Sequence, residues 1–182
     1  MKKNFIEIYD DIIPLTLQDY VEFLVIKNGI NVIPFNFVKG MTDHKEESNS
    51  DYGWIHKLLL CENGDKFFSD YMATIHQILY YFTMYKKLNI KQILASRIFL
   101  QTPSLNPGVQ KPHIDTTNSH LACLYYINDS DGDTVFYNKD KEIKRVSPKK
   151  GRIVFFDGLI KHSGSRPKDN HRAIINFNFT VL

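Results

Sequence analysis

Cysteine is scarce in this sequence, and long apolar runs are absent. Two cysteines in 182 residues, Cys61 and Cys123, are too few for the disulfide framework of a small secreted domain. No apolar run approaches the ~18 residues of a membrane-spanning helix. The first residues also lack the apolar core of a secretory leader. We therefore expect a cytoplasmic protein with no membrane partner, in which Cys123 is a buried apolar thiol.

An excess of charge of one sign is also missing. The 23 basic and 20 acidic residues give a net charge of +3, which is too small to indicate a nucleic-acid partner. The densest basic cluster, formed by Lys149, Lys150 and Arg152, is typical of a solvated turn before a strand. Hydrophobic residues make up 43% of the chain and aromatic residues 13%, which predicts a packed core rather than disorder.

Helical spacing of apolar residues is confined to the first half of the chain. After a short predicted strand at Phe5–Tyr9, Thr16 and Asp19 resemble a capping box at the start of a helix. A second helix is predicted from about Asp70 to Lys87, and His76 beside its apolar face is interpreted as structural. The inward residues of this second helix are expected to be Met72, Ile75, Leu79 and Phe82.

From Ile93 onward the chain reads as short strands separated by turns. Helices first and strands later are typical of an α+β protein that is mainly β. At this length we expect one domain, residues 1–182, with helical support and a substrate-side loop in 1–92 and the catalytic strand core in 93–182.

The last predicted strand has two different faces. Side chains alternate along a strand, so Ala173, Ile175, Phe177, Phe179 and Val181 share one wholly apolar face. The opposite face begins at Arg172 and carries Asn176 and Asn178. The apolar face is expected to pack under a covering layer, and the polar one to line a ligand cavity.

His113, Asp115 and His162 form a candidate metal site. Two imidazoles and one carboxylate are the ligand set of non-haem Fe(II) centres with open coordination positions. A His-x-acid triplet alone is weak evidence, and His44-Lys45-Glu46 is a decoy in a polar stretch. The three candidates follow or precede predicted strands, where barrel folds place chemistry. Arg172, ten residues beyond His162, could bind a carboxylate through its guanidinium fork.

Over about residues 95–182 the chain resembles the 2-oxoglutarate and Fe(II)-dependent dioxygenases, in particular their prolyl 4-hydroxylase-like branch. The resemblance rests on the order and spacing of several short pieces. These pieces are His113-Ile114-Asp115, Cys123-Leu124-Tyr125-Tyr126-Ile127-Asn128, Gly132-Asp133-Thr134-Val135-Phe136, Pro148-Lys149-Lys150-Gly151-Arg152-Ile153-Val154-Phe155-Phe156, His162 and Arg172.

This resemblance implies roles for particular residues. His113, Asp115 and His162 would ligate iron. Arg172 and Tyr126 would bind the distal carboxylate of 2-oxoglutarate. In the same co-substrate pocket, Asn176 stands where the family often has a small polar residue. Asn178 stands where some members place a tryptophan beside the iron, so it is a candidate substrate residue.

The resemblance also implies a fold and a reaction. The fold would be a double-stranded β-helix, or jelly roll, with the N-terminal helices packed on one sheet. The reaction would hydroxylate an unactivated C–H bond and release succinate and CO2. It would need Fe(II), 2-oxoglutarate and O2, with ascorbate as an accompanying reductant.

The substrate is expected to be a peptide or protein, with a prolyl-type side chain. Alternatives are the same chemistry on a small molecule, nucleobase or glycan, a non-oxidative cupin-like binding domain, or a structural jelly roll. The loop at residues 40–53 would act either as a substrate lid or as a plain surface connection. Tyr52 and Trp54 beside it would either grip the substrate or anchor the core.

Overall fold

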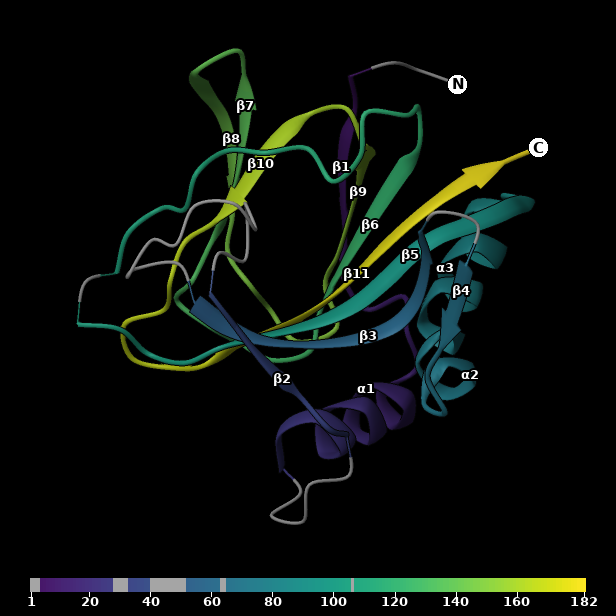
Figure 1. The fold of residues 1–182 in the computed structure, drawn as a ribbon, viewed down its shortest axis with the longest axis horizontal. Helices are drawn as coiled ribbons and strands as arrows, with labels where there is room; N and C mark the ends of the chain where they lie inside the picture. Colours follow the sequence, from purple (N-terminus) through teal and green to yellow (C-terminus); the bar gives the residue numbers. More distant parts are fainter. Residues whose placement is uncertain (1–3, 28–32, 40–51, 63–64, 106) are drawn as a thin grey trace.

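The computed structural model describes residues 4–27, 33–39, 52–62, 65–105 and 107–182. Two antiparallel sheets and a group of helices make up the described chain (Figure 1). The predicted α+β class with mainly β structure is confirmed. Across the described residues, no helix is both long enough and apolar enough to cross a membrane.

The large sheet brings together strands from both halves of the chain. Its strands run in the order β1 (Ile6–Tyr9), β9 (Ile153–Asp157), β6 (Leu121–Tyr126), β11 (Arg172–Val181), β5 (Ile90–Gln101), β3 (Tyr52–Glu62) and β2 (Asn36–Lys39), with β4 (Asp65–Phe68) paired to β3. All these pairings are antiparallel. β11 therefore lies in the middle of the sheet, between β6 and β5.

The small sheet has the order β10 (Lys161–Gly164), β7 (Thr134–Asn138) and β8 (Lys141–Val146). It packs on one face of the large sheet through a buried apolar cluster. That cluster joins Phe136 and Val146 of the small sheet to side chains of β6, β9 and β11, among them Leu124, Phe156 and Ile174. Two sheets packed face to face in this way are the arrangement expected of a jelly roll.

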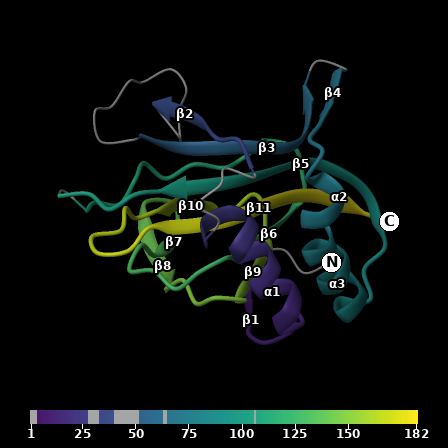
Figure 2. The same cartoon turned by 90° about the horizontal axis from the view of Figure 1, so that it is seen from below.

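The helices cover the opposite face of the large sheet (Figures 1 and 2). They are α1 (Leu15–Glu22), the π-helical turn η1 (Phe23–Lys27), α2 (Met72–Ile75) and α3 (Gln77–Lys86). The predicted helix at 70–87 is thus present, with a break at His76. Of its four expected inward residues, Ile75, Leu79 and Phe82 are fully buried and Met72 is partly buried. The three fully buried residues pack against the apolar face of β11, as the alternation on that strand predicts.

The predicted capping box of the first helix is wrong. The helix begins at Leu15 after Pro14, and no side chain caps it. The backbone amides of Leu17 and Gln18 donate to the Pro14 carbonyl instead, at 2.9 and 3.0 Å. The Asp19 carboxylate is engaged elsewhere, since it pairs with Lys150 at 2.5 Å.

Candidate metal centre and adjoining cavity

The backbone brings the three candidate metal ligands together. His113 and Asp115 lie on the segment between β5 and β6, and His162 is the second residue of β10. His113 and His162 form an antiparallel bridge, with N–H to carbonyl hydrogen bonds of 2.9 Å in both directions. The two rings lie 4.8 Å apart between centroids. A pairing across two distant segments therefore holds the backbones of the two histidines side by side.

One ligand atom from each of the three residues lies within 4.8 Å of the others. The Nε2 atoms of His113 and His162 are each 3.8 Å from one oxygen of Asp115. These separations exceed hydrogen-bond range, so the groups do not satisfy one another. Two imidazole nitrogens and a carboxylate around a common space form a donor set suited to Fe(II).

Neighbouring groups favour the protonation states of His162 and Asp115 that bind a cation. His162 Nδ1 lies 3.1 Å from the Ile160 carbonyl, and a proton held there leaves the Nε2 lone pair free. Burial lowers the pKa of His162 and so favours the neutral ring that a metal needs. Burial works to raise the pKa of Asp115, but the neighbouring His162 and His113, a hydrogen bond from Asn176 and the charge of Arg97 lower it overall. Asp115 is thus kept as a carboxylate.

A cavity of about 220 Å³ adjoins the three ligands. Its floor is the face of the large sheet turned toward β10 and β7, and the strand register divides this floor into three rows. Gln101 of β5 pairs with Arg172 of β11 in the first row. Phe99 pairs with Ile174 in the second. The third row is Lys57 of β3, Arg97 of β5 and Asn176 of β11. All seven of these side chains line the cavity.

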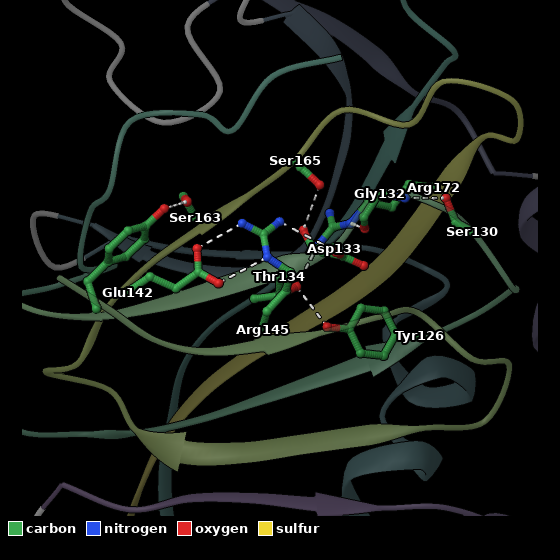
Figure 3. Close-up of polar contacts among 11 residues, drawn as sticks. Tyr126, Ser130, Gly132, Asp133, Thr134, Glu142, Arg145, Ser163, Ser165 and Arg172 are labelled. Atoms are coloured by element: carbon green, nitrogen blue, oxygen red, sulfur yellow. Dashed lines mark hydrogen bonds and ion pairs between the residues drawn. The ribbon is translucent and has the colours of Figure 1, made fainter.

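Arg172 closes the far end of the cavity, and it is only 4% exposed. Its Nε donates to the Gly132 carbonyl at 2.7 Å and its Nη2 to Thr134 Oγ1 at 2.8 Å (Figure 3). Its Nη1 donates to Gln101 Oε1 at 3.1 Å. A Cβ on residue 132 would lie 2.9 Å from the Arg172 side chain, which accounts for the glycine there. Three of five N–H donors are used, so one proton on each terminal nitrogen is left for a ligand.

Thr134, at the start of β7, was not singled out from the sequence, yet it links Arg172 to Tyr126. Its hydroxyl oxygen accepts from Tyr126 at 2.7 Å and from Arg172 at 2.8 Å (Figure 3). Both lone pairs are then occupied, so the proton of Thr134 is available to a ligand in the cavity. Tyr126 itself is fully buried and is not among the lining residues. Besides its bond to Thr134, its ring centroid lies 6.0 Å from the guanidinium carbon of Arg172.

Asn176 lines the cavity at the metal end. Its Nδ2 donates to Asp115 Oδ2 at 3.0 Å, so it contacts a metal ligand rather than the region around Arg172. Asn178 lies one step further along the same face of β11. It is 2% exposed, and it is not among the described residues that line the cavity.

The structure does not bring Tyr52 and Trp54 to the described cavity lining. The Tyr52 ring lies under the Arg166 guanidinium, with 3.8 Å between the guanidinium carbon and the ring centroid. Trp54 packs edge-on against Phe37 at 5.2 Å between centroids. Residues 40–51 of the predicted loop, and the decoy His44-Lys45-Glu46 within it, lie outside the described residues.

Comparisons with known proteins agree with this geometry. Residues 100–180 match the family model of the 2OG-Fe(II) oxygenase superfamily. That match spans the segment with His113 and Asp115 and the strands β6 to β11 almost to their end. No curated protein sequence matches the chain.

Several solved structures share the fold. An oxidoreductase of the 2OG-Fe(II) oxygenase family from Burkholderia pseudomallei is similar with a TM-score of 0.74 and 11% identity, covering 96% of this chain and 84% of that one. A prolyl hydroxylase from Trichoplax adhaerens, in complex with a hypoxia inducible factor peptide fragment, gives 0.64 and 16%, covering 96% and 82%. A Pseudomonas putida prolyl-4-hydroxylase gives 0.62 and 15%, covering 97% and 92%. At these identities the likeness shows the fold alone.

The predicted double-stranded β-helix is therefore confirmed. The family match covers the segment that holds the His-Asp-His group, and that group is assembled in the position the fold provides. Fe(II) and 2-oxoglutarate are the metal and co-substrate expected for such an enzyme. Residues 100–180 thus match the 2OG-Fe(II) oxygenase superfamily by sequence, and the fold and the metal-binding residues agree with that match.

Proposed function

We propose that this enzyme hydroxylates an unactivated C–H bond of a peptidyl, prolyl-type substrate. One molecule of O2 would be consumed with 2-oxoglutarate, giving the hydroxylated substrate, succinate and CO2. One oxygen atom enters the new hydroxyl group and the other enters succinate. The observation that carries the proposal is one cavity with the His-Asp-His group at one end and a buried arginine with two unused N–H donors at the other.

His113, Asp115 and His162 would hold Fe(II), and bound iron would supply the oxygen chemistry. The protein's part is to hold the ligands in place. Asn176 fixes Asp115 by donating to Oδ2, which leaves Oδ1 for the metal. The mutual backbone bridge of the two histidines removes most of their freedom to move apart.

Arg172 and Thr134 would bind the distal carboxylate of 2-oxoglutarate. Arg172 offers one proton from each Nη, which is the arrangement a carboxylate accepts in a bidentate contact. Thr134 would add a third donor, while Tyr126 and Gln101 hold these two residues in position. Arg172 and Asn176 lie four residues apart on β11, about 13 Å along the strand, so a five-carbon diacid fits between the side chains that extend from both ends.

A peptidyl substrate is supported by the fold neighbours. Two of them are prolyl hydroxylases, and one of these was solved in complex with a peptide fragment. The apolar middle row of the cavity, Phe99 and Ile174, offers a surface that suits a proline ring better than a charged side chain.

The test is succinate formation by the purified protein supplied with Fe(II), 2-oxoglutarate and air. Wild-type protein should form succinate slowly without a substrate and faster with a proline-rich peptide, which should gain the mass of one oxygen atom. Asp115→Ala should abolish succinate formation and metal binding, because it removes the only carboxylate among the described lining residues. Lys91→Gln, an exposed change on β5, should leave both intact.

Full activity of Asp115→Ala would refute the metal site. Succinate formation that responds to a small molecule but to no peptide would retain the reaction and reject the peptidyl substrate. The absence of any succinate from wild-type protein would reject the reaction itself.

A further inference from the structure

The third row of the cavity floor places two positive charges side by side. Lys57 of β3 and Arg97 of β5 are direct partners in the antiparallel register. Both line the cavity, and neither has an ion pair with any residue that the structure describes. Like charges directly opposite one another weaken a sheet, so this pair is unfavourable until an anion lies between or above them.

The charges already assigned to the site do not balance this pair. Among the described lining residues, Asp115 is the one carboxylate, and Lys57, Arg97 and Arg172 are permanent cations. Fe(II) adds two positive charges and 2-oxoglutarate adds two negative ones. With neutral histidines, the metal, Asp115, Arg172 and the co-substrate sum to zero. The two charges of Lys57 and Arg97 are therefore left for a further ligand.

Their position points to the substrate rather than to the co-substrate. Arg97 is the cross-strand partner of Asn176, which donates to Asp115. The row thus lies at the metal end of the cavity, four strand positions from the row of Arg172, or about 13 Å. The co-substrate, a five-carbon diacid, would lie between this row and the row of Arg172. Its distal carboxylate is already matched by Arg172.

We propose that Lys57 and Arg97 bind an anionic group of the substrate, a carboxylate or a phosphate carried close to the C–H bond that is oxidised. This proposal rests on the proposed function and names the class of substrate that it takes. Arg97 would grip the anion with its planar fork, and the more exposed Lys57 would act as a point charge. Phe99 and Ile174 beside them would contact the apolar part of the same substrate.

The test measures binding without turnover. Protein loaded with Fe(II) and 2-oxoglutarate in the absence of oxygen is titrated calorimetrically with four blocked proline peptides. These peptides are identical except for one residue, which is glutamate, phosphoserine, glutamine or lysine. The glutamate or the phosphoserine peptide should bind about tenfold more tightly than the glutamine peptide, and the lysine peptide more weakly still. Whichever of the two anionic peptides binds more tightly shows whether the cation pair prefers a carboxylate or a phosphate.

Inorganic phosphate serves as a probe that needs no peptide. At equal ionic strength it should raise the unfolding temperature of the wild-type protein above that measured in chloride. Equal affinity for all four peptides overturns the proposal. The absence of any peptide binding, together with the absence of a phosphate effect, overturns it equally.

Variants of Lys57 and Arg97 test whether these two residues cause the peptide preference and the phosphate effect. Lys57→Gln/Arg97→Gln should lose both the preference for anionic peptides and the phosphate effect, whereas Lys91→Gln should keep both. Without an anion, the double variant should unfold at the same temperature as wild type or higher, because the repulsion between the two cations is gone. A purely structural role for the pair predicts a lower temperature.

Affinity for 2-oxoglutarate should be unchanged in all these variants, and a loss of it in the double variant would overturn the proposal in favour of a co-substrate role. The proposed function fails separately, through the absence of succinate from wild-type protein in air. The binding measurements need no turnover, so they report on the cation pair in either case.

Discussion

The guanidinium of Arg172 is almost fully committed to the protein. Gly132, Gln101 and Thr134 take three of its five protons, and the other two are left for a ligand in the cavity. These hydrogen bonds therefore hold the side chain in one conformation and fix the directions of its two remaining N–H groups. This makes residue 172 the position at which a charge-conserving substitution is most informative.

Arg172→Lys should raise the KM for 2-oxoglutarate about 10- to 100-fold with a smaller change in kcat. A lysine keeps the charge but loses one charged hydrogen bond to the carboxylate, worth about 1.5–3 kcal/mol. Succinate formation at varied 2-oxoglutarate concentration measures the effect. Arg145→Lys, a change at an exposed arginine paired with Glu142, is the matched control. An unaltered KM in Arg172→Lys would reject the co-substrate role.

Thr134→Val should weaken 2-oxoglutarate binding and lower the free energy of unfolding by about 1–3 kcal/mol. Valine has the same shape but leaves the buried Tyr126 hydroxyl without its acceptor. Thr134→Ser keeps the hydroxyl and should behave like wild type. Calorimetric titration and urea unfolding measure the two effects. If valine and serine variants were indistinguishable, Thr134 would have no part in the site.

The sequence predicted correctly which residues lie together at the site. It did not predict the individual hydrogen bonds between them. The histidines, Asp115 and Arg172 were identified because their residue types have few other uses in that order. Thr134 was not, because a threonine at a strand start is ordinary and its contact with Arg172 depends on how two sheets face each other. In the structure the Tyr126 hydroxyl donates to Thr134, and the contact of Tyr126 with the co-substrate stays a prediction. The substrate roles of Asn178, Tyr52 and Trp54 stay predictions that the described cavity does not support.

β11 shows most directly how one strand serves both the core and the site. Its even-numbered residues Arg172, Ile174 and Asn176 line the cavity. Its odd-numbered residues from Ala173 to Phe179 are buried under the helices. Strict alternation made this division predictable. A substitution on the helix-covered face should therefore affect stability and leave ligand binding unchanged.

Phe177→Ala should lower the free energy of unfolding by about 3–5 kcal/mol, because it removes a fully buried ring and leaves a cavity. The ring contacts His76 at 5.7 Å between centroids, on the helix side of the sheet. The KM for 2-oxoglutarate should stay unchanged in the fraction that is folded. Urea unfolding and succinate kinetics test the two halves of this prediction. A raised KM with unchanged stability would reverse the assignment of faces.

The strand β3 was not predicted, and its irregularity explains why. Its register shifts between Lys57 and Leu59, where a bulge lets Lys57 and Leu60 both line the cavity although they are three residues apart. A search for strict alternation misses such a strand. The cation pair on β3 and β5 was missed for a different reason, since its two members become neighbours only through the pairing of the strands.

On the scale of the whole molecule, three layers are stacked: helices, large sheet and small sheet. The large sheet takes β1, β2 and β3 from residues before 93 and β6, β9 and β11 from residues after it. His76 lies at the boundary between helices and sheet, 1% exposed, with its Nε2 2.7 Å from Ser96 Oγ. Its interpretation as a structural histidine agrees with this position.

The stability of the whole fold should depend on pH through His76. Burial lowers its pKa from the ordinary 6.5 to about 4, so between these values the unfolded chain binds more protons than the folded one. Its contribution is intact above pH 6.5 and is lost as the pH falls toward 4, by on the order of 3 kcal/mol. Urea unfolding from pH 7.5 to 4 should show a shallower loss in His76→Gln. Equal slopes in both proteins would contradict the assignment.

The bridge between His113 and His162 also has a kinetic meaning. It joins segments separated by roughly fifty residues, and between them lie β6, β7, β8 and β9. The coordination sphere therefore cannot form on a nascent or half-folded chain; it exists only once both sheets have closed. An ion held there would act as a removable cross-link across the whole jelly roll, so that loading the metal would report the completion of folding.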